Sequence, residues 1–163
     1  MTRRQFDVYI ETVIESGAEE AQRAGSPTVE AEHLLLAVAA DRESPAGQLL
    51  EAAGLGRDAV HRALVREFRE SLAAAGISIA EEDLPRPGVS ATRPSRLGQS
   101  AKLALERGLT TAGARRDLRP RHLLLGILLL EYGTVPRALS LAGVDRPELR
   151  ARVEASLGTE SAS

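Results

Sequence analysis

One stretch of the sequence occurs twice, and this repetition indicates the fold. "EAEHLLLAVAADRES" occupies Glu30–Ser44 and "RPRHLLLGILLLEYG" occupies Arg119–Gly133, so a histidine followed by three leucines recurs 89 positions further along the chain. An internal repeat of this length predicts two copies of one supersecondary unit that pack against each other. The same spacing continues downstream without a gap, where Leu50, Ala53, Gly54 and Arg57 recur as Leu139, Ala142, Gly143 and Arg146.

Apolar residues recur at helical spacing in almost every segment, and no segment alternates as a strand does. The predicted fold class is all-α, with two tandem four-helix repeats. We place the first repeat at residues 6–68, a helix extension and linker at 69–94, the second repeat at 95–157 and a flexible tail at 158–163. Helices are expected over residues 7–24, 30–40, 44–54 and from 56 onward, and then over 96–112, 120–130, 134–142 and 145–157.

Several residues mark where these helices start and stop. Asp7 is the expected N-cap of the first helix, because its carboxylate can accept hydrogen bonds from the open backbone N–H groups of the first turn. Ser44 followed by Pro45 predicts the start of the third helix, and Gly54 predicts its end. Each four-helix unit is small and its second helix is strongly apolar, so we expect the two units to share one core.

The composition is that of an ordinary globular chain and excludes several classes of function. The net charge of −2 gives no general attraction to nucleic acid or to anionic membranes. Without cysteine there is no thiol nucleophile and no thiolate metal site. The longest apolar run, Leu123–Leu130, is far shorter than the ~20 residues that span a bilayer. Because Asp7 and Glu11 stand where a signal peptide would be apolar, we expect a cytoplasmic protein.

These features resemble the amino-terminal repeat domain of the Clp chaperone-ATPases, the unfoldases that feed Clp proteases. The signature of that family, Thr-Glu-His before an aliphatic run, is matched by Ala31-Glu32-His33 and by Pro120-Arg121-His122. Phe6-Asp7 stands where the family has Phe-Thr. The resemblance covers about residues 6–157 and implies two four-helix repeats that are related by a pseudo-twofold axis.

The chain also departs from the family pattern. Ser95-Arg96 or Leu97-Gly98 stands where the second repeat would open with an aromatic residue, and Arg121 replaces the glutamate of the second signature. No G-x-x-x-x-G-K-[ST] phosphate loop occurs in the sequence, so we expect no nucleotide site of that type and no cofactor. The resemblance therefore implies the receptor domain of such a chaperone without its ATPase.

Glu32 is the residue to which the resemblance assigns a ligand. In some members of the family this glutamate helps to bind arginine-phosphorylated segments of substrates, and a carboxylate suits a guanidinium as a bidentate partner. The alternative is a first-turn glutamate that only interacts with the helix dipole. Arg121 cannot hold a guanidinium in the second repeat, because the two positive charges would repel each other.

His33 and His122 occupy equivalent positions, which allows two interpretations. They could form a metal or acid–base pair, or each could be fixed by backbone hydrogen bonds at the start of a helix. The sequence favours the structural role, because no H-E-x-x-H motif occurs and neighbouring helix residues point in different directions.

The stretch "ARRDLRPRH" places Arg119 and Arg121 ahead of a helix start, with two further arginines upstream. Such a cluster can attract a small anion or an acidic partner segment, or it can be a solvated loop. A nucleic-acid interface would need a wider basic surface or aromatic stacking platforms, so we expect none.

No motif supports catalysis, and the resemblance implies a non-catalytic protein-binding module. It would act as an adaptor or a decoy in Clp-dependent proteolysis, binding Clp substrates, adaptors or a Clp ATPase through a groove between the repeats and the surface around Phe6, Asp7 and Glu32. The alternative is a protein that sequesters a small ligand or a cyclic peptide antibiotic, since such antibiotics bind this family's domain. Under either hypothesis we expect no bound metal and no membrane partner.

Overall fold

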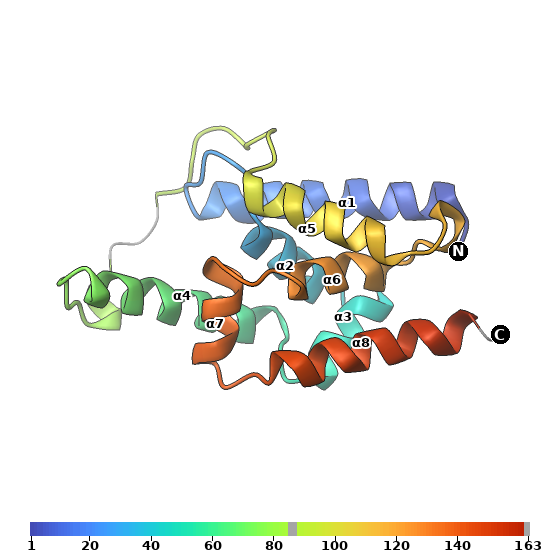
Figure 1. Ribbon diagram of the computed structural model, residues 1–163. Coiled ribbons are helices and arrows are strands. Elements are labelled where there is room, and N and C mark those ends of the chain that lie inside the picture. Colours follow the sequence, from blue (N-terminus) through green and yellow to red (C-terminus); the bar gives the residue numbers. More distant parts are fainter. Residues whose placement is uncertain (85–87, 162–163) are drawn as a thin grey trace.

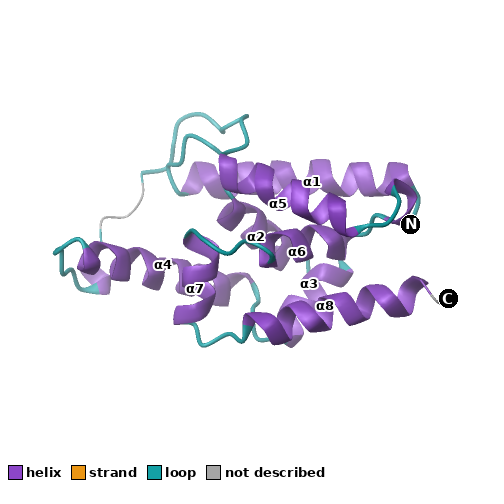
Figure 2. Cartoon of the chain, viewed as in Figure 1, coloured by secondary structure: helices purple, strands orange, loops and turns teal. Residues whose placement is uncertain are grey.

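The computed structural model describes residues 1–84 and 88–161. Within these residues the chain forms two successive sets of four α-helices and no strand beyond an isolated bridge between Val29 and Leu97 (Figures 1 and 2). The all-α prediction and the four-plus-four order are therefore confirmed. The helices are α1 (Arg3–Arg23), α2 (Ala31–Ala40), α3 (Pro45–Ala52), α4 (Arg57–Ala74), α5 (Gln99–Thr111), α6 (Pro120–Leu128), α7 (Thr134–Leu141) and α8 (Arg146–Ser161), with short 3₁₀ turns η1 (Glu81–Asp83) and η2 (Arg115–Asp117).

The second helix of each set forms the centre of the molecule. In Figure 1, α2 and α6 lie between α1 and α5 on one side and α3, α7 and α8 on the other. Every residue of α6 is buried except Arg121, and in α2 only Glu32 and Ala40 are not buried. The leucines of both helices belong to one continuous apolar cluster, as the shared core requires.

The first helix starts one turn earlier than predicted, so Asp7 is not its N-cap. The Thr2 hydroxyl accepts a hydrogen bond from the Gln5 N–H at 3.3 Å, and the Gln5 side chain accepts one from the Thr2 N–H at 2.6 Å. This reciprocal pair satisfies two backbone donors at residues where the apolar pattern has not yet begun. Asp7 instead lies on the exposed face of α1, 4.0 Å from Arg3.

The third helix begins as predicted, with the Ser44 hydroxyl accepting from the Gly47 N–H at 3.0 Å and Pro45 in the first position. The equivalent elbows after α3 and α7 both turn at a glycine with positive φ, +74° at Gly54 and +74° at Gly143. At this φ a side chain would be strained, which explains why glycine recurs in both repeats.

His33 and His122 have the structural role that the sequence favoured. The Nδ1 atom of His33 accepts a hydrogen bond from the Glu30 N–H at 2.9 Å, and that of His122 accepts one from the Arg119 N–H at 2.9 Å. Each buried imidazole thus satisfies a backbone donor just before its helix. Burial lowers the pKa of His33, which favours the neutral ring that this contact requires.

The segment between the two sets is only partly a loose linker. The α4 helix continues to Ala74, and its C-terminal end projects away from the other helices (Figure 1). Phe68 on α4 is 48% exposed. Ser90 is tied to α1 by two hydrogen bonds with Gln22, each of 3.0 Å. The first four residues of the expected tail are helical, because α8 continues to Ser161. Residues 85–87 of the predicted linker and residues 162–163 of the tail lie outside the described part of the chain.

Candidate functional site

Glu32 opens onto a pocket of about 420 Å³ between the two repeats. Three helix starts border this pocket, those of α2, α5 and α7, together with the connection between α6 and α7. We call it the Glu32 pocket. Its lining consists of Glu30, Ala31, Glu32, Gln99, Ser100, Leu103, Leu130, Tyr132, Gly133, Thr134 and Val135.

A reciprocal cap holds the starts of α2 and α5 together. The Glu30 carboxylate accepts hydrogen bonds from the Ser100 N–H at 3.3 Å and from the Ser100 hydroxyl, while the hydroxyl oxygen accepts one from the Ala31 N–H at 2.9 Å. The bridge between Val29 and Leu97 lies directly beside this cap. One repeat therefore caps the other at this point, and that contact fixes the position of Glu32.

The Glu32 carboxylate is half-buried and accepts no hydrogen bond from any other described residue. Burial raises its pKa, and the nearby carboxylates of Glu30 and Glu67 raise it further, against a lowering contribution from its own backbone N–H. For Glu30, burial alone would raise the pKa, but hydrogen bonds from Ser100 and Thr28 outweigh it and lower the value. Of these two acids only Glu32 lacks a partner.

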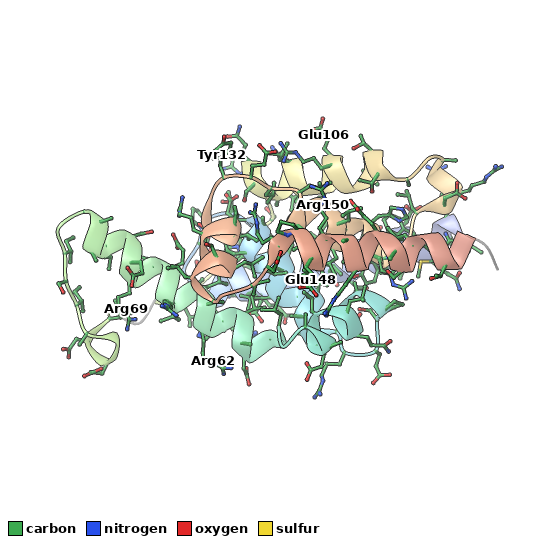
Figure 3. The ribbon with its side chains drawn as sticks, turned by 60° about the horizontal axis from the view of Figure 1, so that its bottom comes forward. Arg62, Arg69, Glu106, Tyr132, Glu148 and Arg150 are labelled. Atoms are coloured by element: carbon green, nitrogen blue, oxygen red, sulfur yellow. The ribbon has the colours of Figure 1, made fainter. Side chains whose placement is uncertain are left out.

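Other parts of the lining of the Glu32 pocket contribute an aromatic ring and backbone donors. Tyr132, which Figure 3 labels, is 88% exposed, and Leu103, another lining residue, is 37% exposed. Gly133 has no side chain with which to cap α7, so the N–H groups of Thr134 and Val135 meet no side-chain acceptor among the described residues. The sequence hypotheses did not include Tyr132, although an aromatic residue in a short helix connection was visible there.

This arrangement suits a cationic side chain. A desolvated, unpartnered carboxylate gains most from a guanidinium, which can form two hydrogen bonds with it. Tyr132 can lie over the face of the cation, and the apolar side chains can line its stem. Open N–H groups at the start of a helix attract an anion, so a charge of opposite sign next to the guanidinium has a place at α7.

The equivalent position in the second repeat is engaged in a different way. The half-buried Arg121 donates a hydrogen bond to the Ser156 carbonyl of α8 at 3.3 Å. Arg119 donates to the carbonyls of Arg116 and Leu118 at 3.2 Å and 2.9 Å. Both arginines contact carbonyls of their own chain, and their charge is opposite to that of Glu32.

The remaining candidates, Phe6 and Asp7, do not join the Glu32 pocket. The side chain of Phe6 is only 3% exposed and its ring lies 6.4 Å from that of Tyr9. The start of α1 lies beside η2, at the end of the molecule away from the connection between α1 and α2 (Figure 1). The structure therefore separates Phe6, Asp7 and Arg119 from Glu32.

Two further findings concern metal ligands and membrane spans among the described residues. No three histidine or acidic side chains among them are arranged to hold a metal ion. None of the described helices has both the length and the apolarity needed to cross a membrane.

Comparison with known proteins gives a family and a fold. The family model of the Clp repeat (R) N-terminal domain matches residues 5–93, which is more than half of the chain. Among solved structures, the N-terminal domain of the caseinolytic protease associated chaperone ClpD from Arabidopsis thaliana has a TM-score of 0.60 at 20% sequence identity. The match covers 90% of this chain and 92% of that one, so it includes the second repeat. No curated protein matches the chain.

Proposed function

The chain belongs to the Clp repeat N-terminal domain family, which indicates a Clp-related protein-interaction module, and from this membership we propose how it binds. It takes a cationic side chain of a partner protein into the Glu32 pocket and acts as an adaptor or a decoy in Clp-dependent proteolysis. Its role is binding, with no catalytic step.

The observation that carries this proposal is that the unpartnered carboxylate of Glu32 shares one pocket with Tyr132 and with the open start of α7. A phosphoarginine residue has a guanidinium joined to a phosphoryl group, so its positive charge suits the Glu32 carboxylate and its negative charge suits the open N–H groups at the start of α7. The second repeat offers no equal site, because Arg121 would repel the guanidinium. We therefore expect one such ligand per chain.

Calorimetric titration with phosphoarginine and with an arginine-containing peptide tests the binding site. Loss of a charged hydrogen-bond partner costs about 1.5–3 kcal/mol, so Glu32→Gln should weaken binding roughly ten- to a hundredfold. Tyr132→Ala should weaken it by roughly two- to fivefold, the value of an exposed cation–π contact. Glu106→Gln is the matched control, since Glu106 is exposed on α5 outside the pocket (Figure 3).

Arg121→Gln should leave the affinity unchanged. Equal losses for Glu32→Gln and Arg121→Gln, or a stoichiometry of two ligands per chain, would contradict the assignment of the site to the first repeat.

The role in proteolysis requires a separate measurement. Added to a Clp protease that is degrading an arginine-phosphorylated substrate, an excess of the chain should slow the reaction if it is a decoy and accelerate it if it is an adaptor. Either effect should disappear with Glu32→Gln. An unchanged rate with the unmodified chain would contradict both roles.

Sequestration of a small ligand or a cyclic peptide antibiotic was the other hypothesis. The adaptor or decoy hypothesis placed Phe6 on the binding surface beside Glu32. Because Phe6 is almost fully buried, the pocket at Glu32 has the better support.

A further inference from the structure

A second groove separates the fourth helices of the two repeats, and it is independent of the Glu32 pocket. It has a volume of about 510 Å³ and lies between α4 and α8, and the elbows at Gly54 and Gly143 also line it. Figure 3 shows this side of the molecule, with Arg62 labelled on α4 and Glu148 on α8. We call it the elbow groove.

The charges along the elbow groove are not balanced. Arg62 and Arg66 lie one turn apart on α4, both exposed, and neither forms an ion pair with any described residue. The acids of the groove are already engaged: Glu148 accepts a hydrogen bond from Arg152 at 2.8 Å, and Asp145 accepts one from the Glu148 N–H at 3.0 Å. Two cations therefore remain available for acidic groups from outside.

The two arginines are not a by-product of the repeat. At the repeat spacing of 89, Arg62 corresponds to Ala151 and Arg66 to Ala155. The α8 wall carries one arginine of its own, Arg152, which is paired with Glu148 at 2.8 Å. Arginines without an ion pair to a described residue therefore line only the α4 wall, and a bound chain would meet different walls on its two sides.

The floor of the groove is apolar and made of small or buried side chains. Ala59 and Ala63 come from α4, Leu149 from α8, and Leu55 and Val144 from the two elbows. Side chains of this size leave room for an apolar group between the charged walls.

We infer that the elbow groove binds an extended acidic segment of a partner protein, with carboxylates on Arg62 and Arg66 and an apolar side chain on the floor. A nucleic acid would place phosphates along the whole groove, including beside Asp145 and Glu148, where they would be repelled. A peptide can place its acids on one side only. The charge pattern of the groove therefore selects the peptide.

Fluorescence anisotropy with a labelled hexapeptide of sequence Glu-Leu-Glu-Glu-Leu-Glu tests the inference on the full chain. We expect saturable, salt-sensitive binding that falls at least about tenfold in the double variant Arg62→Glu/Arg66→Glu. The control Arg150→Glu changes a charge on α8 that is paired with Glu154, at 3.1 Å, and lies outside the groove. It should bind the peptide as the unmodified chain does, and circular dichroism should show that all variants are folded.

A lysine–leucine hexapeptide should not bind, and Glu32→Gln should leave binding of the acidic peptide unchanged, which separates this site from the proposed function. Absence of saturable binding, or equal affinity in the double variant, overturns the inference. It is also overturned if a single-stranded oligonucleotide of matching charge competes with the peptide at lower concentration.

Discussion

Glu32 and Arg121 occupy the same place in the two repeats and are the positions at which the polar side chains of α2 and α6 reach solvent. Such a position is free to vary, because the packing of each central helix does not depend on it. The two repeats carry opposite charges at this position, a glutamate in the first and an arginine in the second. Arg121 is held by the end of α8, whereas Glu32 remains without a partner, which is the condition for a ligand site.

Glu32 should therefore cost stability in the absence of a ligand. Its pKa is raised in the folded chain, so the folded state binds more protons than the unfolded state between the ordinary and the raised pKa. Stability accordingly falls as pH rises through that window. We expect Glu32→Gln to raise the melting temperature at pH 7.

The gain from Glu32→Gln should shrink as the pH is lowered to the ordinary pKa of a glutamate and below, where both states are protonated. Affinity for an arginine ligand should fall over the same range, since the ligand requires the ionised carboxylate. Thermal melts from pH 4 to pH 7 measure the first effect. A variant that is less stable than the unmodified chain at pH 7 would show that Glu32 contributes to the fold.

At the scale of the helices, the order of the helices and the residues that recur at their ends could be predicted from the sequence. The exact first residue of a helix depended on local hydrogen bonds. Ser44, Gly54 and the two histidines act as predicted, because each effect involves residues close in sequence. The N-cap at Thr2 was missed because an apolar pattern does not report the polar turn that precedes it.

The Glu32 pocket was only partly predictable, because many of its residues are distant from Glu32 in the sequence. Glu32 itself was visible in the repeated signature, but its surroundings come from α5 and the connection to α7, about 70 to 100 residues away. Nothing local in the sequence connects Ser100 or Tyr132 with Glu32. Two buried carboxylates were missed likewise: Glu20, which Arg57 contacts through two hydrogen bonds of 2.9 Å, and Glu67, which Arg137 contacts at 2.9 Å.

The packing of α5 on α6 gives a prediction at this scale. A Cβ atom at Gly126 would overlap the carbonyl oxygen of Ala104 and lie 2.6 Å from the backbone nitrogen of Gly108. Because both are backbone atoms, the helices themselves would have to separate. Gly126→Ala should destabilise the chain by about 1–3 kcal/mol in urea unfolding.

Gly158→Ala is the matched control for Gly126→Ala. Gly158 also lies within a helix, but nothing approaches its Cβ position within 4 Å. There the higher helix propensity of alanine should leave stability unchanged or raise it by up to about 1 kcal/mol. Equal effects at the two positions would mean that α5 and α6 are not held together as closely as the structure shows.

For the whole molecule, the repeat has one main consequence: neither set of helices has a core of its own. Leu35 of α2 and Leu124 of α6 are each no more than 1% exposed and lie in the same cluster. The contact between α2 and α6 connects the two halves, and the Glu30–Ser100 cap connects them again at the surface. We therefore expect the chain to unfold as one unit.

Leu35→Ala and Leu124→Ala test this expectation from opposite sides of the core. Each should cost about 2–5 kcal/mol, because the lost methyl groups leave a cavity in a fully buried place. If the core is shared, Leu35→Ala must also lower the hydrogen-exchange protection of α6, and Leu124→Ala that of α2, by the same free energy. Native-state exchange followed by mass spectrometry of peptides from the two helices measures both. Protection that falls only in the helix carrying the substitution would show that the repeats open separately, and a cost below about 1 kcal/mol for both variants would place these leucines outside the core.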